Sequence, residues 1–139
     1  MMIWEIPKWG IMPWAWAGFF SQGAKLVSEA IHSGKVFEGR AWDEVRKHTG
    51  QGGTLHLIGL VSDGNVHSHI DQLYALLARC VTDNIKRVRI HGLLDGRDVG
   101  QRSALTFFEP LEKKLEEFST DGRDYRMASG GGRMVTTMD

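Results

Sequence analysis

Residues 55–61, LHLIGLV, form a continuous apolar run of strand length. Such a run is typical of a strand buried on both faces of a parallel sheet, because helices cover both sides of that kind of sheet. A second strand is expected at RVRIHGLL, residues 87–94, and a short third strand at YRMAS, residues 125–129. The sequence therefore predicts three strands, and the segments between them must supply the helices.

Apolar residues at helical spacing fill those segments. They predict a helix over about 69–82 and another over about 105–118, where Pro110 should cause a kink or divide the segment into two abutting helices. Before the first strand, a helix that ends near Gly34 and a short helix over 41–47 are expected.

This alternation of strands and helices predicts an α/β fold, a parallel sheet with flanking helices, from about Gly53 to Ser129. Three strands are few for such a sheet, so we expect an incomplete piece of a larger one. Residues 1–20 show no amphipathic period and are expected to lack stable packing.

Composition narrows the possible partners and compartments. The chain has 139 residues, enough for one domain, and its 17 basic residues equal its 17 acidic residues, so nothing favours nucleic acid as a partner. No membrane-length apolar stretch and no signal-peptide pattern is present, so no membrane association is expected. The single cysteine, Cys80, indicates a reducing compartment such as the cytoplasm, and its apolar helical context favours packing over reactivity.

In open parallel sheets, ligands bind beyond the carboxyl ends of the strands. Three loops are expected there: S-D-G-N-V-H-S-H over 62–69, D-G-R-D over 95–98 and S-G-G-G-R over 129–133. Two guanidinium groups, a histidine and glycine-exposed backbone amides form a clamp for a phosphate or a carboxylate. The side chains expected at this edge are Asp63, His67, His69, Asp95, Arg97, Asp98 and Arg133.

These loops have alternative interpretations. Each loop alone is also typical of an ordinary turn, and a histidine beside a strand end often has only a structural role. Zinc is disfavoured because no Cys or Glu stands at ligand spacing from His67 and His69. A nucleophilic role for Ser62 is disfavoured because Asp-Gly follows it and it does not lie in G-x-S-x-G.

The remaining copies of these residue types are expected to be structural. D-G-R-D recurs at residues 121–124, but there it precedes a strand, so it should form a solvated turn at the opposite edge of the sheet. His56 and His91 lie within strands and are expected in the core or at its flank. His32 and His48 are expected at the exposed ends of helices.

Three motifs in this order resemble those of the phosphoglycerate mutases that work independently of 2,3-bisphosphoglycerate. That family carries L-H-L-x-G-L-x-S-D-G-G-V-H-S-H, then D-G-R-D, then S-G-(G-G)-R, and this chain has LHLIGLVSDGNVHSH, LLDGRD and ASGGGRMVTTMD. The stretch QGAKLVSEAIHSGKVFE is similar to the helix that precedes the first strand in the family. The likeness runs from about Ser21 to Asp139, and ASGGGRM is closest to the plant and trypanosomatid type.

The resemblance implies a phosphoryl-transfer enzyme related to alkaline phosphatase. In the family, two Mn²⁺ or Mg²⁺ ions activate a serine that carries phosphate between the two hydroxyls of glycerate, so 3-phosphoglycerate and 2-phosphoglycerate interconvert in glycolysis. Carried over by motif, the residues that hold the phosphoglycerate are His67, Arg97, Asp98 and Arg133. Asn65 departs from the family's glycine and would distort its turn if that turn needs a positive φ. The resemblance also implies a monomeric protein, and a cytoplasmic location is expected.

The family's nucleophilic serine lies in N-S-E-V-G-H just upstream of QGAKLV, where this chain instead has MMIWEIPKWGIMPWAWAGFF. Back-translated and read two nucleotides later, that stretch accepts D-D-M-G-N-S-E-V-G-H-N-A-L-G-V-G-R-V-F. Glycines of the recovered string fall at the places of Trp4, Trp9, Trp14 and Trp16, because a displaced glycine codon preceded by TG reads as TGG. We therefore interpret residues 1–20 as an out-of-frame, unstructured segment. A tryptophan-anchored segment at a membrane surface is the structural alternative.

On this reading, residues 21–139 are an incomplete piece of the phosphotransferase (substrate-binding) domain of the mutase. The chain has no catalytic serine and no metal ligands, because those of the family lie elsewhere in its sequence, so this chain should be inactive and bind no metal. A non-catalytic α/β module that binds phosphoglycerate or another small anion is the rival hypothesis.

Overall fold

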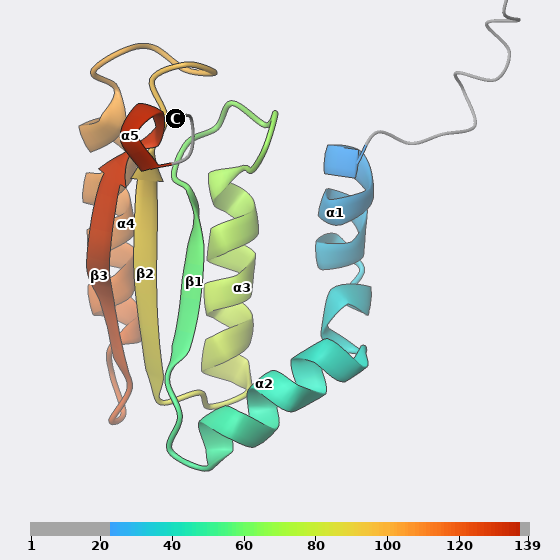
Figure 1. The fold of residues 1–139 in the computed structure, drawn as a ribbon. Helices are drawn as coiled ribbons and strands as arrows, with labels where there is room; N and C mark the ends of the chain where they lie inside the picture. Colours follow the sequence, from blue (N-terminus) through green and yellow to red (C-terminus); the bar gives the residue numbers. More distant parts are fainter. Residues whose placement is uncertain (1–22, 137–139) are drawn as a thin grey trace, which may run out of the picture.

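The computed structural model describes residues 23–136, so the predictions for residues 1–20 lie outside the described residues. Along the chain, the elements are α1 (Gly23–His32), the 3-10 turn η2 (Lys35–Phe37), α2 (Arg40–Gly50), β1 (Leu55–Leu60), α3 (Ile70–Thr82), β2 (Arg87–Leu94), α4 (Ala104–Phe118), β3 (Asp124–Gly132) and α5 (Arg133–Thr136). Figure 1 shows the strands side by side, with α1 and α2 beyond α3.

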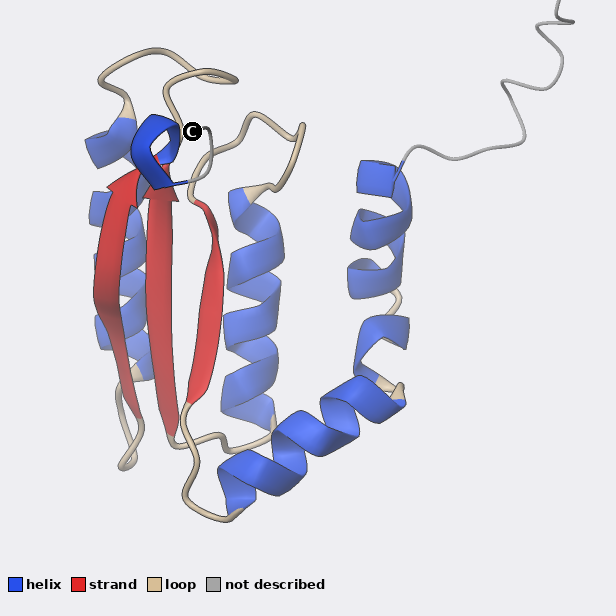
Figure 2. Ribbon diagram, in the orientation of Figure 1, coloured by secondary structure: helices blue, strands red, loops and turns tan. Residues whose placement is uncertain are grey.

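The three strands form one parallel sheet in the order β1-β2-β3 (Figure 2). Leu57 of β1 is in register with Ile90 of β2, and Ile90 is in register with Met127 of β3. Because parallel crossovers share one handedness, a sheet whose spatial order equals its chain order places both crossover helices on the same face. The predicted α/β fold, with a parallel sheet and flanking helices, is confirmed.

One face of the sheet carries the hydrophobic core. Leu77 of α3 and Leu111 of α4 are fully buried together with Val88 and Ile90 of the central strand. Cys80 belongs to the same cluster, and burial raises the pKa of its thiol to about 12, in agreement with a packing role. The core therefore lies between the sheet and the two crossover helices.

The prediction that the first strand is buried on both faces of the sheet is wrong. Ile58, in the middle of β1, is 73% exposed, although a strand buried on both faces was expected. This face of the sheet points toward the viewer in Figure 2. Among residues 23–136, what lies in front of it is confined to its upper end, where α5 is drawn. The apolar run was read correctly as a strand, but α3 and α4 both cover its other side.

A row of polar side chains crosses this open face. His56 Nδ1 lies 2.9 Å from His91 Nε2, and His91 Nδ1 lies 2.6 Å from Ser129 Oγ. The imidazole centroids are 5.2 Å apart with nearly parallel planes, and this separation combined with so short an N···N distance means that the rings meet edge to edge. Both histidines therefore flank the sheet, the second of the two predicted locations.

The third strand is longer than predicted. The glycines expected in a loop, Gly130 to Gly132, instead pair with Gly92, Leu93 and Leu94 of the central strand. A Cβ at Gly130 would lie 2.9 Å from the Gly92 carbonyl oxygen, so the close approach of the two strands requires glycine there. The strand ends at Gly132, and Arg133, the first residue of α5, still lies at the carboxyl edge.

The helices agree with their periodicity, and α2 extends beyond its predicted bounds of 41–47. The first ends where Gly34 adopts φ 79°, a left-handed conformation that glycine adopts without strain. Pro110 lies inside a single helix, α4, so the expected division into two abutting helices is wrong. His69 caps the first turn of α3: its Nδ1 accepts a hydrogen bond from the Asp71 amide at 3.1 Å.

The second D-G-R-D copy forms a turn at the amino edge of the sheet, as predicted. Asp121 and Gly122 have positive φ, and β3 starts at Asp124. The turn is less solvated than expected, because the Arg123 side chain is only 12% exposed and its Nε donates to the Phe118 carbonyl at 3.0 Å.

Candidate functional site

The carboxyl ends of the three strands gather the predicted loops at one edge of the sheet. In Figure 1, the loops after β1 and β2 and the short helix α5 lie together at the upper end of the strands. Ser62 follows the first strand, Asp95 directly follows the second, and Arg133 directly follows the third. We call this edge the strand-end site and define it by Ser62, His67, Asp95, Arg97, Asp98 and Arg133.

Asp95 lies at the centre of the strand-end site, and its side chain is only 2% exposed. Its Oδ2 accepts a 2.6 Å hydrogen bond from the Ser62 hydroxyl. Its Oδ1 accepts from the amides of Arg97 and Asp98 at 3.1 and 3.0 Å and from Arg133 Nη1 at 3.0 Å. Burial alone would raise the pKa of this carboxyl, but these hydrogen bonds outweigh burial and lower the pKa to about 2.

Arg133 is a buried cation held by two carboxylates. Its side chain is 5% exposed, and Nη1 donates to Asp95 Oδ1 at 3.0 Å and to Asp98 Oδ2 at 2.7 Å. The hydrogen bond to Asp98 raises the pKa of the guanidinium against the opposing effect of burial, so the side chain stays charged. A buried charge is tolerated only when it is paired in this way.

The loop over residues 62–69 is shaped by a close contact and a left-handed residue. A Cβ at Gly64 would lie 2.8 Å from the Asp98 Cβ, so the loop lies directly against the D-G-R-D segment. Asn65 adopts φ 53°, a conformation that asparagine adopts more readily than most residues. The departure from the family's glycine therefore leaves the turn formed.

His67 and Arg97 are the exposed members of the site. The His67 side chain is 59% exposed, and its Nε2 lies 4.0 Å from Asp98 Oδ2. Arg97 is also exposed, and its backbone amide is anchored on Asp95. The structure thus joins His67, Asp98 and Arg133 in a row and places Arg97 next to them. Nitrogen donors and carboxylates alternate here, which suits an anionic ligand that also carries hydroxyl groups.

Two residues predicted at this edge, His69 and Asp63, are not part of the strand-end site. His69 is occupied as the cap of α3, and Asp63 is exposed in the loop without a role in the contacts around Asp95. Sequence reasoning missed Ser62, which is 1% exposed and bonds to Asp95. The available signal was that Ser62 and Asp95 follow neighbouring parallel strands.

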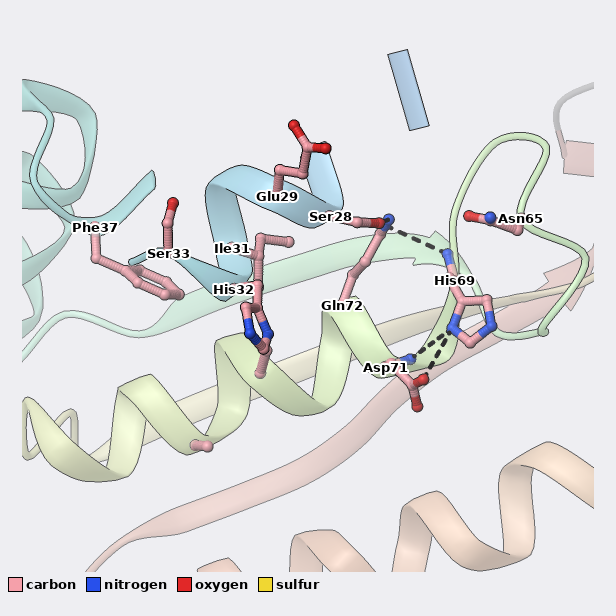
Figure 3. A pocket seen from close by; sticks show the side chains of 12 residues that line it. Ser28, Glu29, Ile31, His32, Ser33, Phe37, Asn65, His69, Asp71 and Gln72 are labelled. Carbon is pink, nitrogen blue, oxygen red and sulfur yellow. Dashed lines mark hydrogen bonds and ion pairs between the residues drawn. The ribbon is translucent and has the colours of Figure 1, made fainter. Parts of the chain in front are cut away.

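A groove separates α1 from α3, as Figure 3 shows, and has a volume of about 990 Å³. Ile31 and Phe37 contribute apolar lining, and Asn65 and His69 belong to its end nearest the loop after β1. The groove does not include His67, Arg97, Asp98 or Arg133. We locate the functional site at the strand ends because the charged groups converge there.

Among residues 23–136, no group of three or more His, Cys, Asp or Glu side chains is arranged to hold a metal ion. Within the same part of the chain, no helix has the length and apolar character that crossing a membrane requires.

A sequence profile described as BPG-independent PGAM N-terminus (iPGM_N) matches residues 27–139, most of the chain. The chain belongs to the BPG-independent phosphoglycerate mutase family. The predicted resemblance is confirmed. Because the matched segment spans all three strands, the strand-end site lies inside the region that the family shares.

Individual members of the mutase family agree with this assignment. A probable 2,3-bisphosphoglycerate-independent phosphoglycerate mutase of Leptospira interrogans (serovar Lai) is 52% identical over 121 residues, which are 86% of this chain and 22% of the relative. The Nicotiana tabacum enzyme is 51% identical over 120 residues, 86% of this chain and 21% of the relative. A crystal structure of Leishmania mexicana phosphoglycerate mutase at low cobalt concentration matches with a TM-score of 0.80 and 46% identity, over 85% of this chain and 22% of that one. The chain spans about a fifth of the length of these relatives.

Proposed function

We propose that residues 21–139 form part of the substrate-binding domain of a cofactor-independent phosphoglycerate mutase, and that the strand-end site holds 3-phosphoglycerate or 2-phosphoglycerate. The observation that carries the proposal is the convergence of three loops on Asp95, which brings His67, Arg97, Asp98 and Arg133 to one edge. Family membership supports the choice of phosphoglycerate among small anions.

Each residue has a role that suits its chemistry. The exposed Arg97 would form paired hydrogen bonds with the phosphate or carboxylate group, and His67 would donate a further hydrogen bond. Asp98 accepts hydrogen bonds and would receive one from a glycerate hydroxyl. The buried guanidinium of Arg133 holds the Asp98 carboxylate in place for that purpose and adds to the positive potential.

Phosphoryl transfer is not assigned to this chain. The two Mn²⁺ or Mg²⁺ ions implied by the family would activate the nucleophilic serine, but the donor sets among residues 23–136 do not fit such ions. No N-S-E-V-G-H motif is present in the sequence. We infer that this chain supplies only substrate-holding residues and that it acts as a cytoplasmic, monomeric protein without nucleic-acid or membrane partners. The balanced charge supports the absence of a nucleic-acid partner, and the single cysteine supports the cytoplasmic location.

A second part of the proposal concerns residues 1–20 and the gene that encodes them. We propose that they are translated out of frame, which is supported by the match between the four tryptophans and the glycines of the recovered motif. DNA sequencing of the locus tests this directly. A run of about five thymines at the codons of Phe19 and Phe20, and an alternative frame that spells the serine motif, are expected. Codons that cannot spell the motif in any frame would refute it.

An enolase-coupled assay tests the proposed lack of catalysis. With purified chain, Mn²⁺ and 3-phosphoglycerate, no turnover is expected, and any turnover that EDTA abolishes would contradict the proposal. A non-catalytic phosphoglycerate-binding module is the second candidate, favoured by the fact that this chain alone brings the four side chains together. Tight, saturable binding in a calorimetric titration, lost in Arg97→Ala, would favour that module over an inactive piece of the mutase.

A further inference from the structure

We propose that Asp95 is the positioning residue of the strand-end site: it fixes the three loops in one arrangement, so that the ligand-holding side chains keep their places. The proposal rests on the proposed function, because it concerns the residues assigned there to phosphoglycerate. Asp95 itself is too buried to be a contact of the ligand, with a side chain that is 2% exposed.

The first argument is the number of segments that end on one carboxylate. Oδ2 receives the Ser62 hydroxyl, which ties down the loop after β1. Oδ1 receives the amides of Arg97 and Asp98, which fold the D-G-R-D segment back onto its own first residue. The same oxygen receives Arg133 Nη1, which ties down the start of α5. Each of the three loops therefore has a hydrogen bond to this residue.

The second argument concerns charge. Arg133 and Asp95 are both buried, and each compensates part of the other's charge. Asp98, which lies between Arg133 and the exposed His67, is thereby held by a guanidinium that Asp95 keeps in place. An asparagine at position 95 would retain one acceptor oxygen but would lose the charge that compensates Arg133.

The second D-G-R-D copy provides an internal comparison. Asp121 is the first residue of that copy, yet its side chain is 81% exposed and contacts Arg123 two residues away. The D-G-R-D sequence alone is therefore insufficient to bury its first aspartate in a hydrogen-bond network. What distinguishes Asp95 is its position directly after the central strand, between the loops that follow β1 and β3.

The test uses the ¹⁵N-labelled 139-residue chain without ligand and compares Asp95→Ala and Asp95→Asn with the matched control Asp121→Ala. Hydrogen exchange of the Arg97 and Asp98 amides and the guanidinium signals of Arg133 are the readouts, and the amides of Val88 and Ile90 report on the sheet. In Asp95→Ala, exchange at Arg97 and Asp98 should accelerate at least tenfold relative to the sheet amides. The control should change these rates less than twofold.

Asp95→Asn separates positioning from general stability and covers the case in which the alanine variant fails to fold. Protection of the two amides should be largely retained, because an acceptor oxygen remains, while the Arg133 signals shift, because the charge is gone. Unchanged Arg133 signals in Asp95→Asn, or unchanged amide exchange in a folded Asp95→Ala, would overturn the proposal. Since no ligand is used, the result stands apart from whether phosphoglycerate binds.

Discussion

Arg133 donates a 2.7 Å hydrogen bond to the same Asp98 oxygen that lies 4.0 Å from His67 Nε2. One carboxylate oxygen therefore stands between a buried guanidinium and an exposed imidazole, although the two groups come from segments that follow the outer strands of the sheet. Because of this arrangement, a substitution of Asp98 should affect the surroundings of both His67 and Arg133.

Asp98→Ala should lower the free energy of unfolding by about 2 kcal/mol, because the buried Arg133 loses its ion pair with the Asp98 carboxylate. Urea unfolding measures the change. The matched control is Asp43→Ala, which removes the exposed partner of Arg46 and should change stability by less than about 0.5 kcal/mol. Equal effects of the two substitutions would mean that the pair at the site is not buried as described.

Acid should weaken the fold through Asp95. Its pKa is lowered from 3.8 to about 2, so its stabilising contribution is complete above pH 3.8 and is lost as the pH falls toward 2. The gap corresponds to about 2 kcal/mol. Urea unfolding between pH 5 and pH 2 should therefore show a steeper loss of stability in the parent chain than in Asp95→Asn. Parallel curves for the two proteins would contradict the lowered pKa.

Gly64→Ala should disturb the site through packing. The new Cβ would lie 2.8 Å from the Asp98 Cβ, so one loop must shift, and we expect a loss of about 1–3 kcal/mol in the free energy of unfolding. At Gly100, an added Cβ meets nothing within 4 Å, so Gly100→Ala serves as the control and should cost far less. The opposite order of the two effects would show that the loops are not in contact.

The asymmetry of the sheet can be measured with two core-type substitutions. Leu77→Ala removes a fully buried side chain between α3 and the sheet and should cost about 2–5 kcal/mol. Ile58→Ala, on the open face where the side chain is 73% exposed, should cost less than about 0.5 kcal/mol. A large loss at Ile58 would mean that this face is covered in the protein.

Much of the fold was predictable because the spacing of apolar residues and the position of turn residues indicate strands and helices locally. The central strand was predicted over the residues it occupies, 87–94, since polar and apolar residues alternate along most of it and turn residues bound it on both sides. The coverage of each face was not predictable from the run at 55–61, because an apolar sequence does not reveal on which side the helices pack. The extension of β3 through its glycines was missed because it depends on a neighbouring glycine, Gly92, in another strand.

The site was predictable as a location but not as a network. The rule that ligands bind beyond the carboxyl ends of parallel strands gathered the correct three loops. It could not show that Asp95 would be buried or that Ser62 would bond to it, because these contacts depend on how far each side chain reaches across neighbouring strands. It also grouped His69 with the site, whereas the start of α3 uses that imidazole as its cap.

The most direct test of the central claim is a titration of the ¹⁵N-labelled chain with 3-phosphoglycerate, followed by ¹H–¹⁵N NMR, which detects even millimolar affinity. Shifts should concentrate at His67, Arg97, Asp98 and Arg133. Arg97→Ala should abolish them, whereas Arg126→Ala, an exposed arginine in the part of β3 near its amino end, should leave them intact. No shift at these four residues at saturating ligand, or equal loss in both variants, would contradict the assignment of this edge to phosphoglycerate.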